Sequence, residues 1–88
     1  NLETKSLESM NIQIYPNPVY DQLKIKFEKD ANSTNLEIND MNGRLLKSQK
    51  MLNGVENVID VSALPAGVYY CTIRRNDEVG RVRIVHLR

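Results

Sequence analysis

From residue 12 onward, apolar and polar side chains alternate along this chain with a period of two. In "DQLKIKF" (21–27), three large apolar residues share one face and two lysines share the other, and "NLEIND", "VENVIDV", "VYYCTIR" and "RVRIVHL" repeat the pattern. Successive side chains of a strand point to opposite faces, so this alternation predicts strands with one buried and one wet face. We expect strands at 12–15, 20–27, 35–40, 44–50, 55–61, 68–75 and 79–87. The side chains expected inside are Leu23, Ile25, Phe27, Leu36, Ile38, Ile59, Val61, Leu64, Tyr69, Cys71, Ile73, Val82 and Ile84.

Turn signals separate these runs, and no stretch holds a helical period beyond about two turns. Asn42-Gly43 is a strong hairpin signal because both residues tolerate a positive φ. Short strands with turns every 8–12 residues or so indicate an all-β sandwich or barrel. The fold class we expect is therefore all-β, with about seven antiparallel strands.

Two prolines lie between the first and second expected strands, just before the second begins. Pro16 and Pro18 each fix φ and lack a backbone N–H, and each moves the residue before it, Tyr15 and Asn17, out of the α region. Such a stretch cannot lie in the middle of a sheet. We expect a stiff corner where the chain leaves one edge and enters the next element.

Composition limits the remaining possibilities. Eighty-eight residues, 41% of them hydrophobic, suit one small domain with a modest core. Twelve Lys and Arg against eleven Asp and Glu give a net charge of +1, which does not support nucleic-acid binding. The single cysteine cannot form an internal disulfide, and no apolar run approaches the length of a membrane span.

The first eleven residues have too little apolar periodicity to bury anything, and the chain starts without Met or an apolar signal segment. We interpret residues 1–11 as a linker from an upstream domain and residues 12–88 as the folded domain. A short docked element is the alternative for residues 1–11.

No pattern in the sequence indicates catalysis. His86 and Cys71 are the only residues of their types, and together they cannot fill a tetrahedral metal site. Cys71 alternates with apolar neighbours and is expected to be a small core residue, and the aspartates beside turns are expected to hydrogen-bond those turns. We therefore expect no enzyme, no metal and no cofactor.

The outward positions hold several basic side chains. An ordinary solvated face is the simpler interpretation, and a surface for an anionic partner is the alternative. The second requires that the strands carrying these residues share one sheet: Lys24, Lys26, Arg74, Arg81 and Arg83.

The ordered set "YPNPVYDQLKI", "LEINDMNGRLL", "NGVENVIDVSALPAGVYYCTI" and "RVRIVHLR" resembles the type A C-terminal sorting domain of the type IX (Por) secretion system of Bacteroidetes-group bacteria. The resemblance covers residues 12–88. The chain departs from the family pattern at Cys71, where a plain aliphatic residue is usual, and at its last three residues, which replace a lysine-rich end.

This resemblance implies an immunoglobulin-like antiparallel β-sandwich in two sheets and a non-catalytic secretion signal. Such a signal directs an attached cargo across the outer membrane and is often removed afterwards by a surface sortase-like peptidase. The implied partners are the outer-membrane translocon, that peptidase and the cargo domain in the same chain, with no nucleic acid and no membrane insertion. The implied location is the periplasm in transit, then the cell surface or the extracellular space.

Recognition is expected to involve the proline corner, the start of the "GVY" strand and an exposed, charged chain end. The residues concerned are Pro16, Asn17, Pro18, Gly67, Tyr69, Arg81, Arg83, Val85, His86, Leu87 and Arg88. Two other functions remain open. An adhesion or carbohydrate-binding module would need a platform built from Tyr15, Tyr20 and Tyr70, and a spacer at the end of a secreted enzyme would need none.

Overall fold

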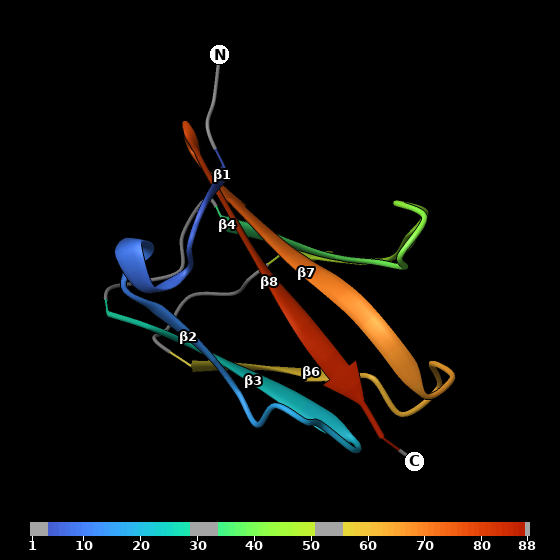
Figure 1. Ribbon diagram of the computed structural model, residues 1–88. Helices are drawn as coiled ribbons and strands as arrows, with labels where there is room; N and C mark the ends of the chain where they lie inside the picture. The colour runs from blue at the N-terminus through green and yellow to red at the C-terminus, as the bar shows by residue number, and fades with distance from the viewer. Residues whose placement is uncertain (1–3, 29–33, 51–55, 88) are drawn as a thin grey trace.

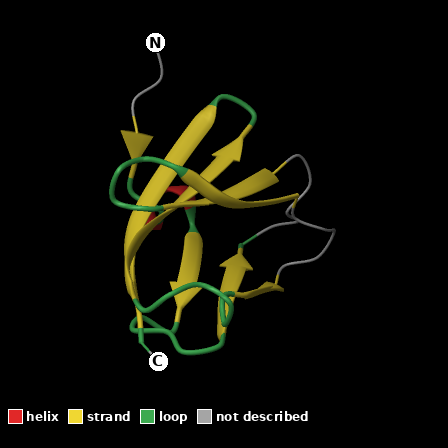
Figure 2. Cartoon of the chain, turned by 90° about the vertical axis from the view of Figure 1, so that its right-hand side faces the viewer, coloured by secondary structure: helices red, strands yellow, loops and turns green. Residues whose placement is uncertain are grey.

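The computed structural model describes residues 4–28, 34–50 and 56–87, which form two packed sheets (Figures 1 and 2). The larger sheet has the order β1-β8-β7-β4-β5, and the smaller has the order β2-β3-β6. Every pairing is antiparallel except that of β1 with β8. The elements are β1 (Thr4–Lys5), the 3₁₀ turn η1 (Glu8–Met10), β2 (Ile12–Tyr15), β3 (Gln22–Phe27), β4 (Thr34–Asn39), β5 (Leu45–Lys50), β6 (Glu56–Asp60), β7 (Gly67–Arg75) and β8 (Glu78–His86).

The expected all-β, immunoglobulin-like sandwich is confirmed. Each of the seven strands expected from the alternation is present, with ends that differ by no more than two residues. The alternation also assigns the faces correctly, as β3 and β6 show with strict exposed–buried patterns. Local periodicity is sufficient for these two strands because each has one face on the core and one in water. It is less informative for β5, which has no buried residue, and for β7, whose outward Thr72 is buried.

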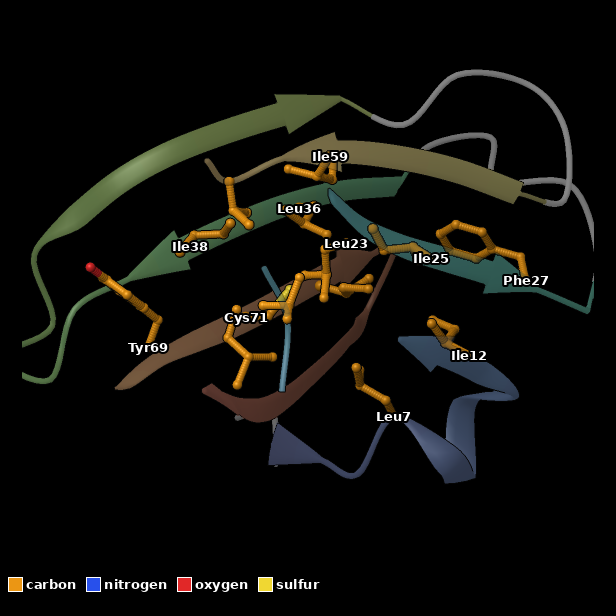
Figure 3. Packing of buried hydrophobic residues seen from close by; sticks show 14 of the residues in the cluster. Leu7, Ile12, Leu23, Ile25, Phe27, Leu36, Ile38, Ile59, Tyr69 and Cys71 are labelled. Atoms are coloured by element: carbon orange, nitrogen blue, oxygen red, sulfur yellow. The ribbon is translucent and has the colours of Figure 1, made fainter. Parts of the chain in front are cut away.

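The core lies between the inner faces of the two sheets (Figure 3). Eleven of the thirteen side chains expected inside are buried, and Leu64 and Val82 are only half-buried against the cluster. Leu64 belongs to the loop between β6 and β7 rather than to a strand. Val82 lies on β8 beyond Val79 and Gly80, the two residues that pair with β1.

The N-terminal segment is part of this sandwich, so the expectation that it buries nothing is wrong. Leu7 and Met10 are only 6% and 3% exposed. β1 pairs with β8, and the Met10 carbonyl accepts a hydrogen bond of 3.2 Å from Arg75 Nη2. A single 3₁₀ turn places two apolar residues three positions apart, which is too short to produce a periodic pattern. From residue 4 onward the segment is thus a docked element, and an upstream cargo domain stays a prediction.

Candidate recognition surface at one end of the sandwich

Asn17, between the two prolines, joins the corner to the last strand through its side chain. Its Nδ2 donates to the Arg83 carbonyl at 3.0 Å, and its Oδ1 accepts from the Val85 N–H at 3.0 Å. The amide therefore pairs with β8 as a backbone peptide group would. The peptide bonds preceding Pro16 and Pro18 are both cis.

Val19 continues this pairing with its own backbone. Its N–H donates to the Val85 carbonyl at 2.8 Å, and its carbonyl accepts from the Leu87 N–H at 2.8 Å. The outer edge of β8 is thus covered by β1 near its start and by Asn17 and Val19 near its end. The corner is where the structure satisfies the edge of its last strand, with the donor-free prolines on either side of the Asn17 side chain that makes the contact.

His86 was expected to lie in an exposed chain end, and this expectation is wrong. It is 4% exposed, and its ring lies between two backbone carbonyls. Nε2 lies 2.7 Å from the Tyr20 oxygen and Nδ1 lies 3.2 Å from the Pro65 oxygen. Because the partners are both main-chain oxygens, the ring joins the proline corner to the loop before β7 and is a structural residue. The sequence does not reveal this burial, because alternation predicts to which side of the strand a side chain points but not which loops cover that side.

The "GVY" start of β7 meets the same loop. The Tyr69 hydroxyl donates to the Pro65 carbonyl four residues upstream, and Gly67 pairs with His86 in the β7–β8 register. Gly67 has φ of +156°, a conformation that side chains with a Cβ rarely adopt. These contacts explain why a glycine and a tyrosine stand two residues apart here.

Three sequence motifs therefore meet at the end of the sandwich where β8 terminates. In both views, the loop after β2, the loop between β6 and β7 and the end of β8 lie together there (Figures 1 and 2). We call this end the recognition surface. At its rim, Tyr20 is 55% exposed and Leu87 is 36% exposed. Between them is a shallow depression of about 450 Å³ lined by Tyr20, Asp21, Ser62, Leu64, Pro65, Ala66, His86 and Leu87.

The other expected recognition residues lie elsewhere. Arg81 lies on the outer face of the larger sheet, where its guanidinium is 5.7 Å from the centroid of the Tyr70 ring. Arg83 is on the same outer face, although its carbonyl takes part in the corner contact. Arg88 lies outside the described residues.

The single basic stripe considered from the sequence is not formed. Lys24 and Lys26 are on β3 in the smaller sheet, whereas Arg74, Arg81 and Arg83 are on β7 and β8 in the larger one. The two groups therefore face away from each other. The pattern of alternation identifies outward positions but not which strands become neighbours.

Two of the aspartates beside turns, Asp40 and Asp60, hydrogen-bond those turns, as expected. Asp40 Oδ1 accepts from the N–H groups of Asn42 and Arg44, both at 2.9 Å. The hydrogen bond from the Arg44 N–H is the main reason that the pKa of Asp40 lies below its ordinary value. Asp60 accepts from the hydroxyl and N–H of Ser62 at 2.7 and 2.9 Å, and these bonds likewise lower its pKa.

The buried Cys71 is a core residue, as expected. Its side chain is fully covered, and burial raises the pKa of the thiol to about 12. A thiol with so high a pKa carries almost no thiolate at neutral pH, which is the reactive form. Within the described ranges, no group of three or more His, Cys, Asp and Glu is placed to hold a metal ion.

The three tyrosines considered for a sugar platform do not come together. Tyr15 lies on the outer face of the smaller sheet and its hydroxyl bonds Glu56, whereas Tyr70 lies on the outer face of the larger sheet under Arg81. Tyr20 belongs to the recognition surface. A flat binding platform would need neighbouring rings on one face, and these residues occupy three different surfaces.

The fold and this surface define a small β-sandwich module whose unusual residues join its last strand to two distant loops. A family described as the secretion system C-terminal sorting domain matches residues 13–86. The chain belongs to this family, and its motifs are those of the type IX system. It is a C-terminal sorting signal, which implies a cargo in the same chain and export to the cell surface or beyond.

A comparison with curated proteins gave no match. Among the described residues, no helix is long and apolar enough to cross a membrane.

Proposed function

We propose that this domain directs its cargo from the periplasm through the outer-membrane translocon of the type IX system, and that the translocon contacts the recognition surface. After transport, a sortase-like peptidase at the cell surface separates cargo from domain. The proposal extends the family assignment, which gives a sorting signal without saying how it is recognised.

The observation that carries this proposal is the convergence of three motifs at one end of the sandwich. The proline corner reaches β8 through Asn17, and His86 reaches both the corner and the loop before β7. A receptor that binds this end therefore contacts a surface that exists only when the last strand is in place. Such a surface would report that the domain is folded.

The chemistry of the rim also supports recognition there. Tyr20 and Leu87 are among the few large apolar side chains that remain well exposed in the described part of the chain. They border a depression with apolar Leu64, Pro65 and Ala66 in its wall. An apolar patch with an aromatic side chain, surrounded by polar groups, is typical of protein–protein recognition.

The test uses a reporter protein carrying an export signal and fused ahead of the 88-residue chain. Tyr20→Ser and Leu87→Ser each remove one rim side chain. Val58→Ser is the matched control, because Val58 is 46% exposed on the outer face of the smaller sheet. We expect the two rim variants to retain reporter in the periplasm while the control is delivered normally.

Circular dichroism of each purified chain checks that the variants fold. Folded rim variants that are delivered as well as the parent would overturn recognition at this surface. Deletion of residues 12–88 tests the signal itself, since the reporter should then stay in the periplasm. Normal delivery after that deletion would overturn the sorting function altogether.

A further inference from the structure

The outer face of the larger sheet gathers arginines around a tyrosine. The registers place Asn39, Tyr70 and Arg83 in one cross-strand row, Glu37, Thr72 and Arg81 in the next, and Asn35, Arg74 and Val79 in a third. We call this the arginine face, defined by Asn39, Tyr70, Thr72, Arg74, Arg81 and Arg83.

Contacts within the arginine face hold Arg81 in place. Its guanidinium lies over the Tyr70 ring, and its Nε donates to Thr72 Oγ1 at 3.3 Å. Thr72 is 1% exposed because these neighbours cover it. An arginine held along a sheet surface loses less conformational entropy when it binds a carboxylate, and its planar fork suits that group.

A groove of about 290 Å³ runs along this face and onto the β4–β5 turn. Tyr70, Arg74 and Arg81 line it, as does Met41, which is 57% exposed. Tyr, Met and Arg are the residue types enriched at protein interfaces, whereas Lys, Glu and Asp are depleted there. Asp40 also lines the groove, at its turn end, where its carboxylate pairs with Arg44 at 3.2 Å. Apart from Asp40, the groove has the composition of a contact surface.

The outer face of the smaller sheet provides a comparison within the same molecule. Its charged positions are Lys24, Lys26, Glu56 and Asp60, so the charges balance and the residue types are those of an ordinary solvated surface. The outer face of the larger sheet instead carries Arg74, Arg81 and Arg83 on its strands. Two carboxylates lie near them in the described residues: Glu37, which pairs with Arg74 at 3.4 Å, and Asp40, which pairs with Arg44 at 3.2 Å. The excess positive charge is therefore concentrated on one side, although the net charge of the chain is only +1.

We propose that the arginine face docks on a protein partner that presents carboxylates. The inference goes beyond the recognition surface, because it assigns a second contact area on a different side of the sandwich. A protein partner is favoured over an acidic glycan because Arg81 covers one face of the Tyr70 ring, the aromatic group that would otherwise stack on a sugar. Met41 beside the arginines gives an apolar contact that a protein side chain can use.

The test measures binding of the 88-residue chain to fluorescein-labelled poly-L-glutamate by anisotropy, at low and at physiological ionic strength. Arg81→Glu with Arg83→Glu reverses two charges on the arginine face. Lys24→Glu with Lys26→Glu makes the same change in net charge on the opposite side. We expect the first pair to weaken binding about tenfold and the second about twofold at most, because charges act mainly over a Debye length.

Arg81→Lys with Arg83→Lys keeps the charge but removes the planar fork, so its affinity should fall between parent and reversal. Thermal melting checks folding, and Arg83→Glu alone replaces the double reversal if the latter does not fold. Equal losses on the two faces would overturn the proposal. Tighter binding to heparin than to poly-L-glutamate, with the same loss on reversal, would also overturn it and assign the face to an acidic glycan.

A delivery assay separates this inference from the sorting function. The Arg81→Glu and Arg83→Glu pair should lower delivery of the fused reporter severalfold, whereas the lysine pair should not. If deletion of residues 12–88 blocks delivery and the arginine reversal leaves it unchanged, the sorting function stands and docking by the arginine face during export is refuted.

Discussion

Replacing Asn17 with Asp exchanges the side-chain NH2 group for a carboxylate oxygen at the point where the proline corner joins β8. In the parent, the side-chain amide donates to the Arg83 carbonyl and accepts from the Val85 N–H. The carboxylate of Asn17→Asp keeps the acceptor for Val85 but places a second oxygen against the Arg83 carbonyl. One hydrogen bond is lost, and two oxygens with partial or full negative charge face each other.

The expected cost follows from these two contacts. A typical hydrogen bond contributes about 0.5–1.5 kcal/mol to stability. Asn17 is exposed, so water can reach the carbonyl that loses its donor. We expect Asn17→Asp to lower the free energy of unfolding at pH 7 by about 1 kcal/mol, and Asn17→Ala, which loses both bonds, by about 1–2 kcal/mol.

Lowering the pH should restore part of the lost free energy of unfolding in Asn17→Asp but not in Asn17→Ala. A protonated carboxyl can donate to the Arg83 carbonyl as the amide does, so its pKa in the folded state should lie above the ordinary aspartate value. The folded variant then binds a proton more tightly than the unfolded one. Its deficit relative to the parent is complete above the folded-state pKa and shrinks as the pH falls through it.

Urea unfolding of parent and variants at pH 7 and at pH 4 measures both effects through the midpoint and slope. Gln13→Glu is the control, because it makes the same amide-to-carboxyl change on an exposed side chain of β2. The pairing that we describe would be refuted if the free energy of unfolding of Asn17→Asp fell as far below the parent value at pH 4 as at pH 7. It would also be refuted if Asn17→Asp were as stable as the parent at pH 7.

Three further predictions concern the turn, the core and the N-terminal segment. Asp40→Ala should destabilise the domain at pH 7, because the ionised Asp40 carboxylate accepts the hydrogen bonds that lower its pKa and stabilise the fold. The loss should shrink as the pH falls below the ordinary pKa of aspartate, and urea titrations at several pH values measure it. The Cys71 thiol should react with Ellman's reagent at pH 8 only after denaturant is added, and rapid reaction in buffer would contradict its burial. Leu7→Ala should cost about 2–5 kcal/mol and open residues 4–11 to thermolysin, whereas Ser9→Ala, on an exposed residue of the same turn, should leave them resistant.

The strands and their buried faces could be predicted from the sequence because their determinants are local. Alternation along each strand gives the strand and its buried face, as "QLKIKF" in β3 shows with its exposed–buried pattern. The turn at Asp40 is equally local, since its side chain bonds the N–H groups two and four residues ahead. The ordered set of motifs also led to the family, which the match over residues 13–86 confirmed.

The candidate site depended on contacts that only the tertiary structure forms. Asn17 and Arg83 are 66 positions apart, as are His86 and Tyr20, so no periodicity near either residue indicates the pairing. The division of the basic residues between two sheets and the docking of Leu7 likewise depend on contacts between distant parts of the chain. Alternation states which side of a strand is wet, but the neighbour at each strand edge is chosen by pairing across the whole chain, and that choice placed the proline corner on β8.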